Sequence, residues 1–554
     1  MCGILCLIRY NTPIDLTMAH ECLEKLTHRG PDKGNYVHFK VAGLGLNKDK
    51  CEVYMGFRRL SIMDTSDAGL QPFSLNEDRV ICNGEIYDYK ALASKYEIDM
   101  KSECDCEIIL PLHEKLGFAN MLEILDAEFA MTLFDRRTNT IYAARDRYGV
   151  RPLFVGWNMD TKMIGFASEA KALHNIMEYI EPLQPQKYVK INLNTMETGL
   201  NLYEYYHFNK SIASDKITNV EYIHNQIHDL FTKAVKKRLY ADKPIGFLLS
   251  GGLDSSLVVS VATKILGANN IVCFSIGVEN SPDVEAAKKV VEFLGIKNHH
   301  IIPFDIEIGI STIPDVIQIL ESYDITTIRA STPQYLMAKY IREYTDIKVL
   351  LTGEGSDEIN GSYRYHRDAP NDQEFHKDTV RLLEELYMFD NLRTDRTMAS
   401  NGLEVRVPYL DFEFVELIMK IDPKLKMFSL NNMSNGSNES ETSIEKQLLR
   451  DSFKGYLPNE ILYRSKEAFS DAVSSKEINW FKSIQIKAAE TISDNDVKEN
   501  PFKFNTPQTI DALYFRRIFN EIYPERDNLI AHYWLPQFQK DNVFDPSATI
   551  LKSY

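Results

Sequence analysis

The chain has no long apolar run and no block of basic residues. None of its segments approaches the roughly 18 consecutive apolar residues of a membrane-spanning helix. The first nine residues lack the basic start and the uninterrupted apolar run of a signal peptide. With a net charge of -16 and no Lys/Arg cluster, the sequence predicts neither a nucleic-acid nor a membrane partner, although a locally basic pocket can still hold a small anion.

Cysteine is sparse and does not form a metal-binding pattern. The eight cysteines lie at positions 2, 6, 22, 51, 82, 104, 106 and 273. Cys104 and Cys106 are too close together, and lack the second pair that a zinc ribbon requires. Scattered cysteines without a secretion signal favour a reducing, cytoplasmic location. The length of 554 residues and the ordinary globular composition (44% hydrophobic, 26% charged) predict two to four domains.

The first 200 residues or so contain short apolar runs separated by turn residues. The turns include residues 28–32 and the Asn83-Gly84 pair. This pattern predicts an α+β sandwich of stacked antiparallel sheets, flanked by helices over residues 16–26 and 107–115. The predicted strands cover residues 1–8, 41–46, 53–57, 80–82, 130–134 and 140–144.

After about residue 215 strands begin to alternate with longer helical segments. Such alternation predicts an α/β domain with a parallel sheet that binds ligands at the carboxyl ends of its strands. The boundary falls between residues 188 and 218, which gives domains 2–200 and 215–554. Residues 429–443 are rich in Asn and Ser, which is typical of a loop or an insertion. The strands are expected at 244–249, 271–278, 300–304 and 347–351, and the helices at 255–265 and 284–294.

Cys2 becomes the first residue if Met1 is removed. Its thiol then has a free α-amine beside it, and an amine of pKa ~7.7–8.0 suits proton transfer near neutral pH. Asn83 can donate from its side-chain amide and Gly84 from its backbone, which together would hold an oxyanion. Each feature also fits a plainer interpretation: a small side chain in an edge strand for Cys2, and an Asn-Gly hairpin turn for the other two.

Charged residues nearby in this half suit an amino-acid substrate. Arg59 carries a guanidinium that can hold a carboxylate with two parallel hydrogen bonds. Glu85 and Asp105 offer carboxylates to an ammonium group. Each of them alone would also fit a structural salt bridge, so the argument rests on their joint occurrence with Cys2 and Asn83.

These motifs resemble those of the class II glutamine amidotransferases with an N-terminal cysteine, and among them the asparagine synthetases. The matching segments are residues 1–4 (MCGI), 28–32 (HRGPD), 59–62 (RLSI), 83–85 (NGE) and 105–107 (DCE). The resemblance implies an Ntn-type fold in which Cys2 forms a γ-glutamyl thioester and releases ammonia. Asp88 and Cys104 depart from the family pattern without removing a chemical role. The implied glutamine site comprises Arg59, Leu60, Ser61, Ile62, Met63, Asn83, Gly84, Glu85 and Asp105.

A second motif, residues 250–256 (SGGLDSS), lies between an apolar strand and a helix. Its glycines let the backbone wrap an anion, and the following helix N-terminus adds a favourable dipole. No Lys follows the glycines, so the loop is not a Walker A motif. It resembles the PP-loop of ATP pyrophosphatases, which cleave ATP between the α and β phosphates.

Residues 351–358 (LTGEGSDE) form an acidic, glycine-rich cluster after another apolar strand. Its carboxylates suit magnesium binding or proton transfer, although acidic glycine loops are often simple turns. The family resemblance continues through residues 323–331, 404–408, 445–450 and 545–548, and so covers nearly the whole chain. Residues 360–363 depart from it, which leaves the loop geometry open.

The resemblance assigns roles in the second half residue by residue. Lys446 would neutralise charge at the reacting phosphorus, although alone it would pass for an exposed helix lysine. Glu354 would support adenylation and ammonia attack, and Asp254 and Asp357 are the candidate ligands of Mg²⁺. The implied ATP site is Leu249, Ser250, Gly251, Gly252, Leu253, Asp254, Ser255, Ser256, Ile276, Thr352 and Gly353. The implied aspartate and intermediate site is Thr326, Thr327, Arg329, Glu354 and Asp357.

The implied enzyme is a carbon–nitrogen ligase that uses ATP as co-substrate with Mg²⁺. ATP, L-aspartate, L-glutamine and water would give AMP, diphosphate, L-asparagine and L-glutamate through β-aspartyl-AMP, with ammonia passing between the sites. The resemblance implies these small-molecule substrates and is compatible with a homodimer. Two alternatives remain: a synthetase that acts on another carboxylate or closes a lactam, and a glutamine hydrolase or regulatory binder with an inactive second half.

Overall fold

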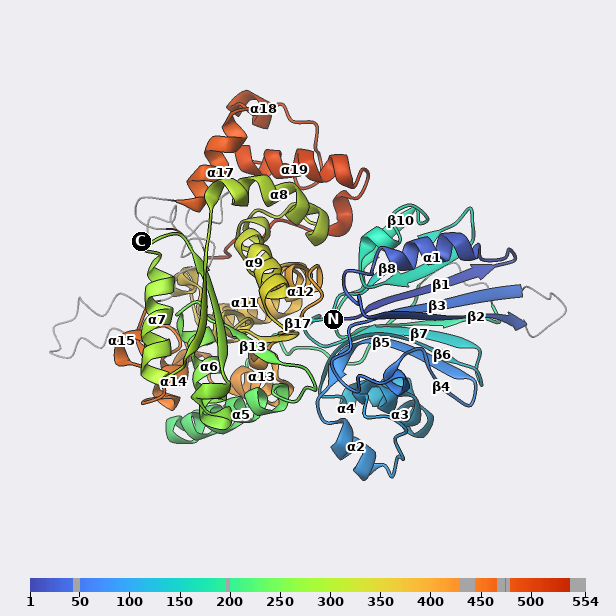
Figure 1. Ribbon diagram of the computed structural model, residues 1–554, viewed down its shortest axis with the longest axis horizontal. Coiled ribbons are helices and arrows are strands. Elements are labelled where there is room, and N and C mark those ends of the chain that lie inside the picture. The colour runs from blue at the N-terminus through green and yellow to red at the C-terminus, as the bar shows by residue number, and fades with distance from the viewer. Residues whose placement is uncertain (43–49, 196–199, 429–443, 466–473, 475–478, 539–554) are drawn as a thin grey trace.

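The computed structural model describes residues 1–42, 50–195, 200–428, 444–465, 474 and 479–538 (Figure 1). Three predicted features lie outside the described residues: positions 43–46 of one strand, the Asn/Ser-rich segment 429–443 and the motif at 545–548. Within the described part, no helix is long and apolar enough to cross a membrane.

The N-terminal half contains two six-stranded antiparallel sheets, which confirms the predicted stacked sheets. The first has the order β10-β8-β9-β1-β3-β2, and the second β12-β11-β7-β6-β5-β4. Strand β1 lies between β9 and β3, so Cys2 leads into an interior strand and not into an edge strand. The strands are β1 (Gly3–Tyr10), β2 (Lys33–Ala42), β3 (Lys50–Arg59), β4 (Phe73–Leu75), β5 (Asp78–Ile86), β6 (Ala127–Asp135), β7 (Thr140–Arg145), β8 (Phe154–Asn158), β9 (Met163–Ala167), β10 (Tyr179–Pro182), β11 (Lys187–Asn192) and β12 (Leu202–Glu204).

Side chains that alternate along these strands build a core on each side of each sheet. On β1, Ile4, Cys6 and Ile8 face the second sheet, whereas Leu5 and Leu7 pack toward α1. Figure 1 shows α1 against one sheet and α2, α3 and α4 against the other. The result is an α/β/β/α arrangement. The helices are α1 (Leu16–Glu24), α2 (Tyr89–Lys95), α3 (Ile109–Leu116) and α4 (Phe118–Ile124), and a 3₁₀ turn at Asp105–Ile108 precedes α3.

The predicted turn at Asn83-Gly84 is wrong. Both residues lie inside β5, where Asn83 pairs with Ala130 and Gly84 with Phe129 of β6. A Cβ at position 84 would approach the Glu128 carbonyl oxygen to 2.4 Å. The glycine is therefore required for close strand packing, and this requirement cannot be distinguished from a turn preference by composition alone.

The second half contains a five-stranded sheet whose pairings are all parallel, in the order β15-β14-β13-β16-β17. This confirms the predicted α/β domain. Its strands are β13 (Ile245–Leu248), β14 (Val272–Gly277), β15 (Asn298–Pro303), β16 (Val349–Leu351) and β17 (Glu404–Arg406). The helices are α5 (Val220–Arg238), α6 (Leu253–Leu266), α7 (Pro282–Leu294), α8 (Ile306–Leu320), α9 (Ile325–Tyr344), α10 (Ser356–Asn360), α11 (Asp372–Glu385), α12 (Asp390–Ala399), α13 (Phe412–Lys420), α14 (Gln447–Ser452), α15 (Asn459–Leu462), α17 (Trp480–Ala489), α18 (Asp494–Lys498) and α19 (Ile510–Ile522).

The two halves share a buried junction around the start of the chain. Figure 1 shows the N-terminus between them, beside α12 and β17. Met1 is fully buried, and its ammonium donates to the Leu403 carbonyl oxygen at 3.3 Å. Arg238 of α5 adds buried ion pairs to Glu128 of β6 and to Asp411, each at 3.0 Å. The position of Cys2 is therefore tied to both halves of the molecule.

Candidate active sites

Cys2 is held by partners on both of its backbone groups. Its nitrogen donates to Asn83 Oδ1 at 2.8 Å, and its carbonyl accepts from Arg29 Nε at 2.9 Å. The thiol lies beside Leu60, whose backbone N–H is 3.5 Å from Sγ. Burial raises the pKa of this thiol to about 11, so Cys2 needs a base to become a thiolate near neutral pH.

The two polar atoms of the Asn83 side-chain amide differ in their hydrogen bonding. Its Oδ1 holds Cys2, while Nδ2 is buried and has no hydrogen-bond partner among the described residues. An unsatisfied buried donor costs stability, so its position needs a functional or structural reason. A donor fixed next to the thiol matches the requirement of an oxyanion hole.

Two charged residues predicted for the glutamine site, Arg59 and Asp105, already have protein partners. Arg59 donates to the backbone carbonyls of Ser66 at 2.5 Å and Met63 at 3.2 Å, and also to that of Asp64. Asp105 accepts from the Ile86 N–H at 2.7 Å. Burial raises the pKa of Asp105 to about 6.

Glu85 is paired across the junction. Its carboxylate lies 2.9 Å from Arg406 of β17, which also binds Glu404 at 2.9 Å. Burial holds the pKa of Glu85 well above its ordinary value, and Arg406 opposes that shift. A residue predicted to contact glutamine is therefore also part of the interface with the second half.

The loop at residues 250–256 lies at the carboxyl end of β13, where ligands of a parallel sheet are expected. Gly251 has φ +78°, and a Cβ there would lie 2.5 Å from the Ala287 nitrogen. Ser250 and Ser255 lie with their hydroxyl oxygens 3.0 Å apart, and α6 begins directly after Gly252. The backbone thus forms a polar loop at a helix N-terminus, which suits a phosphate group.

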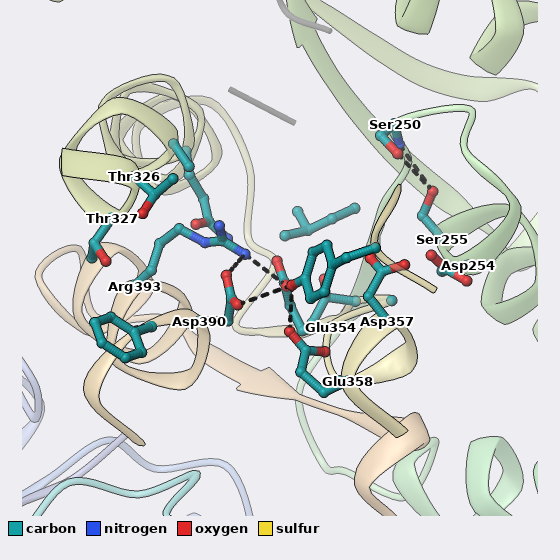
Figure 2. Close-up of a pocket in the computed structure, with 18 of the residues that line it drawn as sticks. Ser250, Asp254, Ser255, Thr326, Thr327, Glu354, Asp357, Glu358, Asp390 and Arg393 are labelled. Carbon is teal, nitrogen blue, oxygen red and sulfur yellow. Dashed lines mark hydrogen bonds and ion pairs between the residues drawn. The ribbon is translucent and has the colours of Figure 1, made fainter. Parts of the chain in front are cut away.

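The acidic cluster after β16 faces this loop. Gly353 permits the approach, since a Cβ there would lie 2.7 Å from the Ser255 nitrogen. The two motifs line one cavity, and Figure 2 shows their side chains around it. Of the predicted residues, the cavity lining includes Leu249, Ser250, Asp254, Ser255, Ile276, Thr326, Thr327, Thr352, Gly353, Glu354 and Asp357. A smaller adjoining pocket is lined by Ser250, Gly252, Leu253, Asp254, Ser255 and Lys446.

Lys446 is buried and is not the exposed helix lysine of the plainer interpretation. Its ammonium lies 2.7 Å from Asp254 and 2.6 Å from Asp357, so it joins the two motifs. The residue has φ +59°, a left-handed backbone that is unfavourable for a lysine by about 1–3 kcal/mol. Arg450 and Arg464 line the same pocket, where they pair with Glu445 at 2.6 Å and with Asp283 at 2.8 Å, so carboxylates balance its positive charges.

Three of the residues predicted for the ATP and aspartate sites line neither pocket: Gly251, Ser256 and Arg329. The structure directs Arg329 away from the cavity, because its guanidinium pairs with Asp511 of α19 and lies 4.1 Å from the Phe481 ring centroid. Thr326 and Thr327 do reach the cavity, and their hydroxyls donate to Asp324, the cap of α9. Two other arginines line the cavity, Arg364 and Arg393.

Arg393 of α12 was missed by the sequence analysis. It lies 2.7 Å from Glu354 and 2.8 Å from Asp390, and these contacts form the dashed network in Figure 2. Glu358 accepts from Tyr363 at 2.6 Å in the same wall, and burial holds the pKa of Glu358 well above its ordinary value. No glycine-rich or acidic motif marks residue 393, so only its place on α12, beside Glu354, identifies it.

Comparisons with known proteins agree with this pair of sites. A model described as asparagine synthase matches residues 226–376 and 367–539, and a glutamine amidotransferase domain model matches residues 1–207. A probable glutamine-hydrolysing asparagine synthetase of Acanthamoeba polyphaga mimivirus is 57% identical over 566 residues, which span 100% of both proteins. The chain belongs to the asparagine synthase family.

More distant members of the asparagine synthase family also match the chain over its full length. The glutamine-hydrolysing asparagine synthetase of Rattus norvegicus is 38% identical over 584 residues, which cover 100% of this chain and 99% of the rat protein. The Homo sapiens protein of the same name is 37% identical with the same coverage. The similarity therefore spans both halves of the chain that carry the candidate sites.

Proposed function

We propose that the protein is a glutamine-dependent asparagine synthetase that joins ammonia from glutamine to the β-carboxylate of aspartate at the expense of ATP. The observation that carries this proposal is the pairing of a held N-terminal thiol with a PP-loop cavity in one chain. Family membership supports the same reaction. Water, ATP, aspartate and glutamine would give AMP, diphosphate, asparagine and glutamate.

In the first step Cys2 Sγ attacks the side-chain amide carbon of glutamine. Removal of Met1 would free the Cys2 nitrogen as an amine, which could take the thiol proton and pass it to the departing ammonia. The free Nδ2 of Asn83, together with the Gly84 backbone N–H, would hold the oxyanion of the tetrahedral intermediate. Water then hydrolyses the thioester and releases glutamate.

Glutamine itself would be placed by charged groups around Cys2. Arg59 would bind its α-carboxylate, and Asp105 and Glu85 would face its α-ammonium group. The backbone from Leu60 to Met63 would form the pocket wall. Support comes from the burial of all three charged side chains, because an ion pair between a buried group and the substrate is less screened than in water.

In the second site the β-carboxylate of aspartate attacks the α-phosphorus of ATP, and diphosphate leaves. The loop of residues 250–256 and the α6 N-terminus would hold the diphosphate, with Lys446 neutralising charge at phosphorus. Leu249, Ile276, Thr352 and Gly353 would contact the nucleotide. Ammonia then attacks the acyl carbon of β-aspartyl-AMP, AMP leaves, and Glu354 accepts the surplus proton.

We extend the aspartate site to residues that the structure adds. Arg393 would pair with the α-carboxylate of aspartate and Asp390 with its α-ammonium group, beside Thr326 and Thr327. Their 2.8 Å ion pair supports this assignment, because opposite charges held together in a cavity match a zwitterion. Arg329 would then act on the cavity only indirectly, through the packing of α9.

Magnesium fits the donor chemistry of this cavity. Asp254 and Asp357 are carboxylates that share one cation, Lys446, and hard oxygen donors of this kind suit Mg²⁺. The ion would neutralise phosphate charge when bound with ATP. The proposal also includes a cytoplasmic setting, because a reducing compartment keeps the Cys2 thiol available.

Ammonia would have to cross the junction without protonation in bulk water. Met1 occupies a buried position between Cys2 and Leu403 of the second half. Its removal would vacate that space on the side of Cys2 that faces the synthetase half. This arrangement supports direct transfer of ammonia between the two sites.

The test is a product assay with aspartate and ATP, using either glutamine or ammonium as nitrogen donor. Wild-type protein should form AMP, diphosphate and asparagine with both donors. Cys2→Ala should abolish the glutamine reaction and keep the ammonium reaction. Equal loss of both reactions would contradict the division of labour, and release of glutamate without any AMP would identify a glutamine hydrolase with an inactive second half.

A further inference from the structure

The buried interface that holds Cys2 includes one helix of the synthetase half. Arg29 donates from Nε to the Cys2 carbonyl oxygen at 2.9 Å. Its two Nη atoms lie 2.7 and 3.1 Å from the two carboxylate oxygens of Asp395, which belongs to α12. Arg29 is fully buried and Asp395 is 1% exposed, so solvent does not screen this two-point contact.

The loop that bears Arg29 has little freedom to move. A Cβ at Gly30 would lie 2.2 Å from the Arg58 carbonyl oxygen, so the backbone next to Arg29 is packed directly on β3. On the other side, Glu169 accepts from Arg29 Nη1 at 2.7 Å. The packed backbone holds the base of the side chain, while Glu169 and Asp395 together fix the orientation of its guanidinium fork.

Helix α12 contributes to both candidate sites. Arg393 reaches Glu354 in the synthetase cavity, and Asp395, two residues later, points to Arg29 and so to Cys2. Residues two apart on a helix project to different sides, which lets one helix serve two sites. Among the described residues, the Asp395 carboxylate accepts hydrogen bonds from Arg29 alone.

We propose that Asp395 is a positioning residue for glutamine hydrolysis, although it belongs to the synthetase half. This inference rests on the proposed function. A nucleophile at the start of a chain has no preceding residue to hold it, so bonds to its own nitrogen and carbonyl must fix its backbone. Asn83 supplies the first bond and Arg29 the second, and Asp395 keeps the Arg29 fork in the orientation that makes it.

The experiment compares Asp395→Asn with wild type in glutamine hydrolysis and in ammonium-dependent synthesis. The amide places N–H groups against a guanidinium, so the fork should rotate and loosen Cys2. We expect kcat for glutamate release to fall ~10- to 100-fold, the scale of a small misplacement of reacting groups. The KM for glutamine should stay within about twofold, because Arg59 and Asp105 are held by hydrogen bonds to Ser66 and Ile86 of the N-terminal half. Ammonium-dependent synthesis should also stay within about twofold of wild type.

Asn391 provides a matched control on the same helix. It is buried, and its Nδ2 donates to the Tyr148 carbonyl of the N-terminal half at 2.9 Å without touching Arg29. Asn391→Ala should leave kcat for glutamine hydrolysis unchanged within about twofold. Asp395→Glu, which keeps the charge, should recover part of the lost kcat.

A double-mutant cycle tests whether Asp395 acts through Arg29. If it does, the double variant Arg29→Lys, Asp395→Asn should hydrolyse glutamine with the same kcat as Arg29→Lys alone. The reason is that both substitutions disturb the same contact with Cys2. Additive losses would overturn the proposal, as would a folded Asp395→Asn protein with normal glutamine hydrolysis or with an equal loss of ammonium-dependent synthesis. If wild-type protein itself releases no glutamate, the proposed function fails instead.

Discussion

Lys446 Nζ lies 2.7 Å from both carboxylate oxygens of Asp254, a residue 192 positions earlier in the chain. The same ammonium donates to Asp357 at 2.6 Å. One cation therefore joins the PP-loop helix, the acidic cluster and the start of α14. All three side chains are largely buried, and removing one partner of such a group leaves an uncompensated charge, at a cost of about 3–5 kcal/mol.

Lys446→Met should therefore stop synthesis and lower stability while sparing the first site. Without the ammonium, charge at phosphorus is not neutralised, and loss of one such electrostatic group costs ~10²–10³ in rate. We expect AMP formation to fall by at least that factor and glutamate release to change by less than about twofold. Lys454→Met is the control, because the Lys454 side chain is 65% exposed and forms an ion pair with Asp451, outside both candidate sites. Normal AMP formation by Lys446→Met would contradict the assigned role.

Glu354→Gln should also reduce synthesis while leaving glutamine hydrolysis intact. The substitution keeps the side-chain shape but removes the charge that pairs with Arg393 and that would accept a proton during ammonia attack. We expect ammonium-dependent synthesis to fall ~10²-fold or more, and glutamine hydrolysis to persist. The two rates are measured as asparagine and glutamate formed by the same preparation. Equal loss of both would mean that Glu354 is a general structural residue.

The sequence was sufficient to predict cavity-lining residues where these lie in short contiguous motifs. Residues 250–256 and the Gly353 loop meet as expected, because both follow parallel strands whose carboxyl ends share one edge. Prediction from the sequence failed for side chains whose interaction partners are far away in the chain. Arg393 has no motif, and its role appears only when α12, packed on α9 and α8, brings it beside Glu354. Arg329 was assigned to the substrates by resemblance, yet the buried carboxylate of Asp511 draws it to α19.

The glutamine site should lose affinity in mild acid. Burial raises the pKa of Asp105 to about 6, so its carboxylate is charged above pH 6 and becomes neutral as the pH falls below it. A neutral group cannot pair with the α-ammonium of glutamine. We expect KM for glutamine in wild type to be flat from pH 7 to 8 and to rise up to ~10-fold per pH unit below 6.

Asp105→Asn should remove this pH dependence and give a high, flat KM. Asp88 supplies the control, because burial also raises its pKa to about 6, and it lies outside the predicted pocket. Asp88→Asn should keep the wild-type KM profile. A wild-type KM that stays constant from pH 5 to pH 8 would show that Asp105 does not hold the ammonium group.

Lys426 should make stability depend on pH in alkaline solution. It is 7% exposed and donates to the carbonyls of Ile418 at 3.1 Å and Ile359 at 3.3 Å, near the ends of α13 and α10. Burial lowers its pKa to about 7. An unfolded lysine has a pKa of ~10.4, so between pH 7 and 10 the unfolded chain binds more protons, and the free energy of unfolding rises with pH by up to ~1.4 kcal/mol per unit from this group. Below pH 7 both states are protonated, and the full cost of the buried ammonium remains.

Lys426→Met should therefore raise the thermal midpoint most at pH 6–7, with a gain that shrinks steadily toward pH 10. The loss of two hydrogen bonds, at about 1 kcal/mol each, offsets part of this gain at every pH. Thermal midpoints of wild type and variant between pH 6 and pH 10 give the difference directly, and other titrating groups cancel in it. Lys424→Met, at a position 68% exposed by side chain, should give a small difference that does not vary with pH. A difference for Lys426→Met that is equally constant would mean that the lysine stays charged in the folded protein throughout this range.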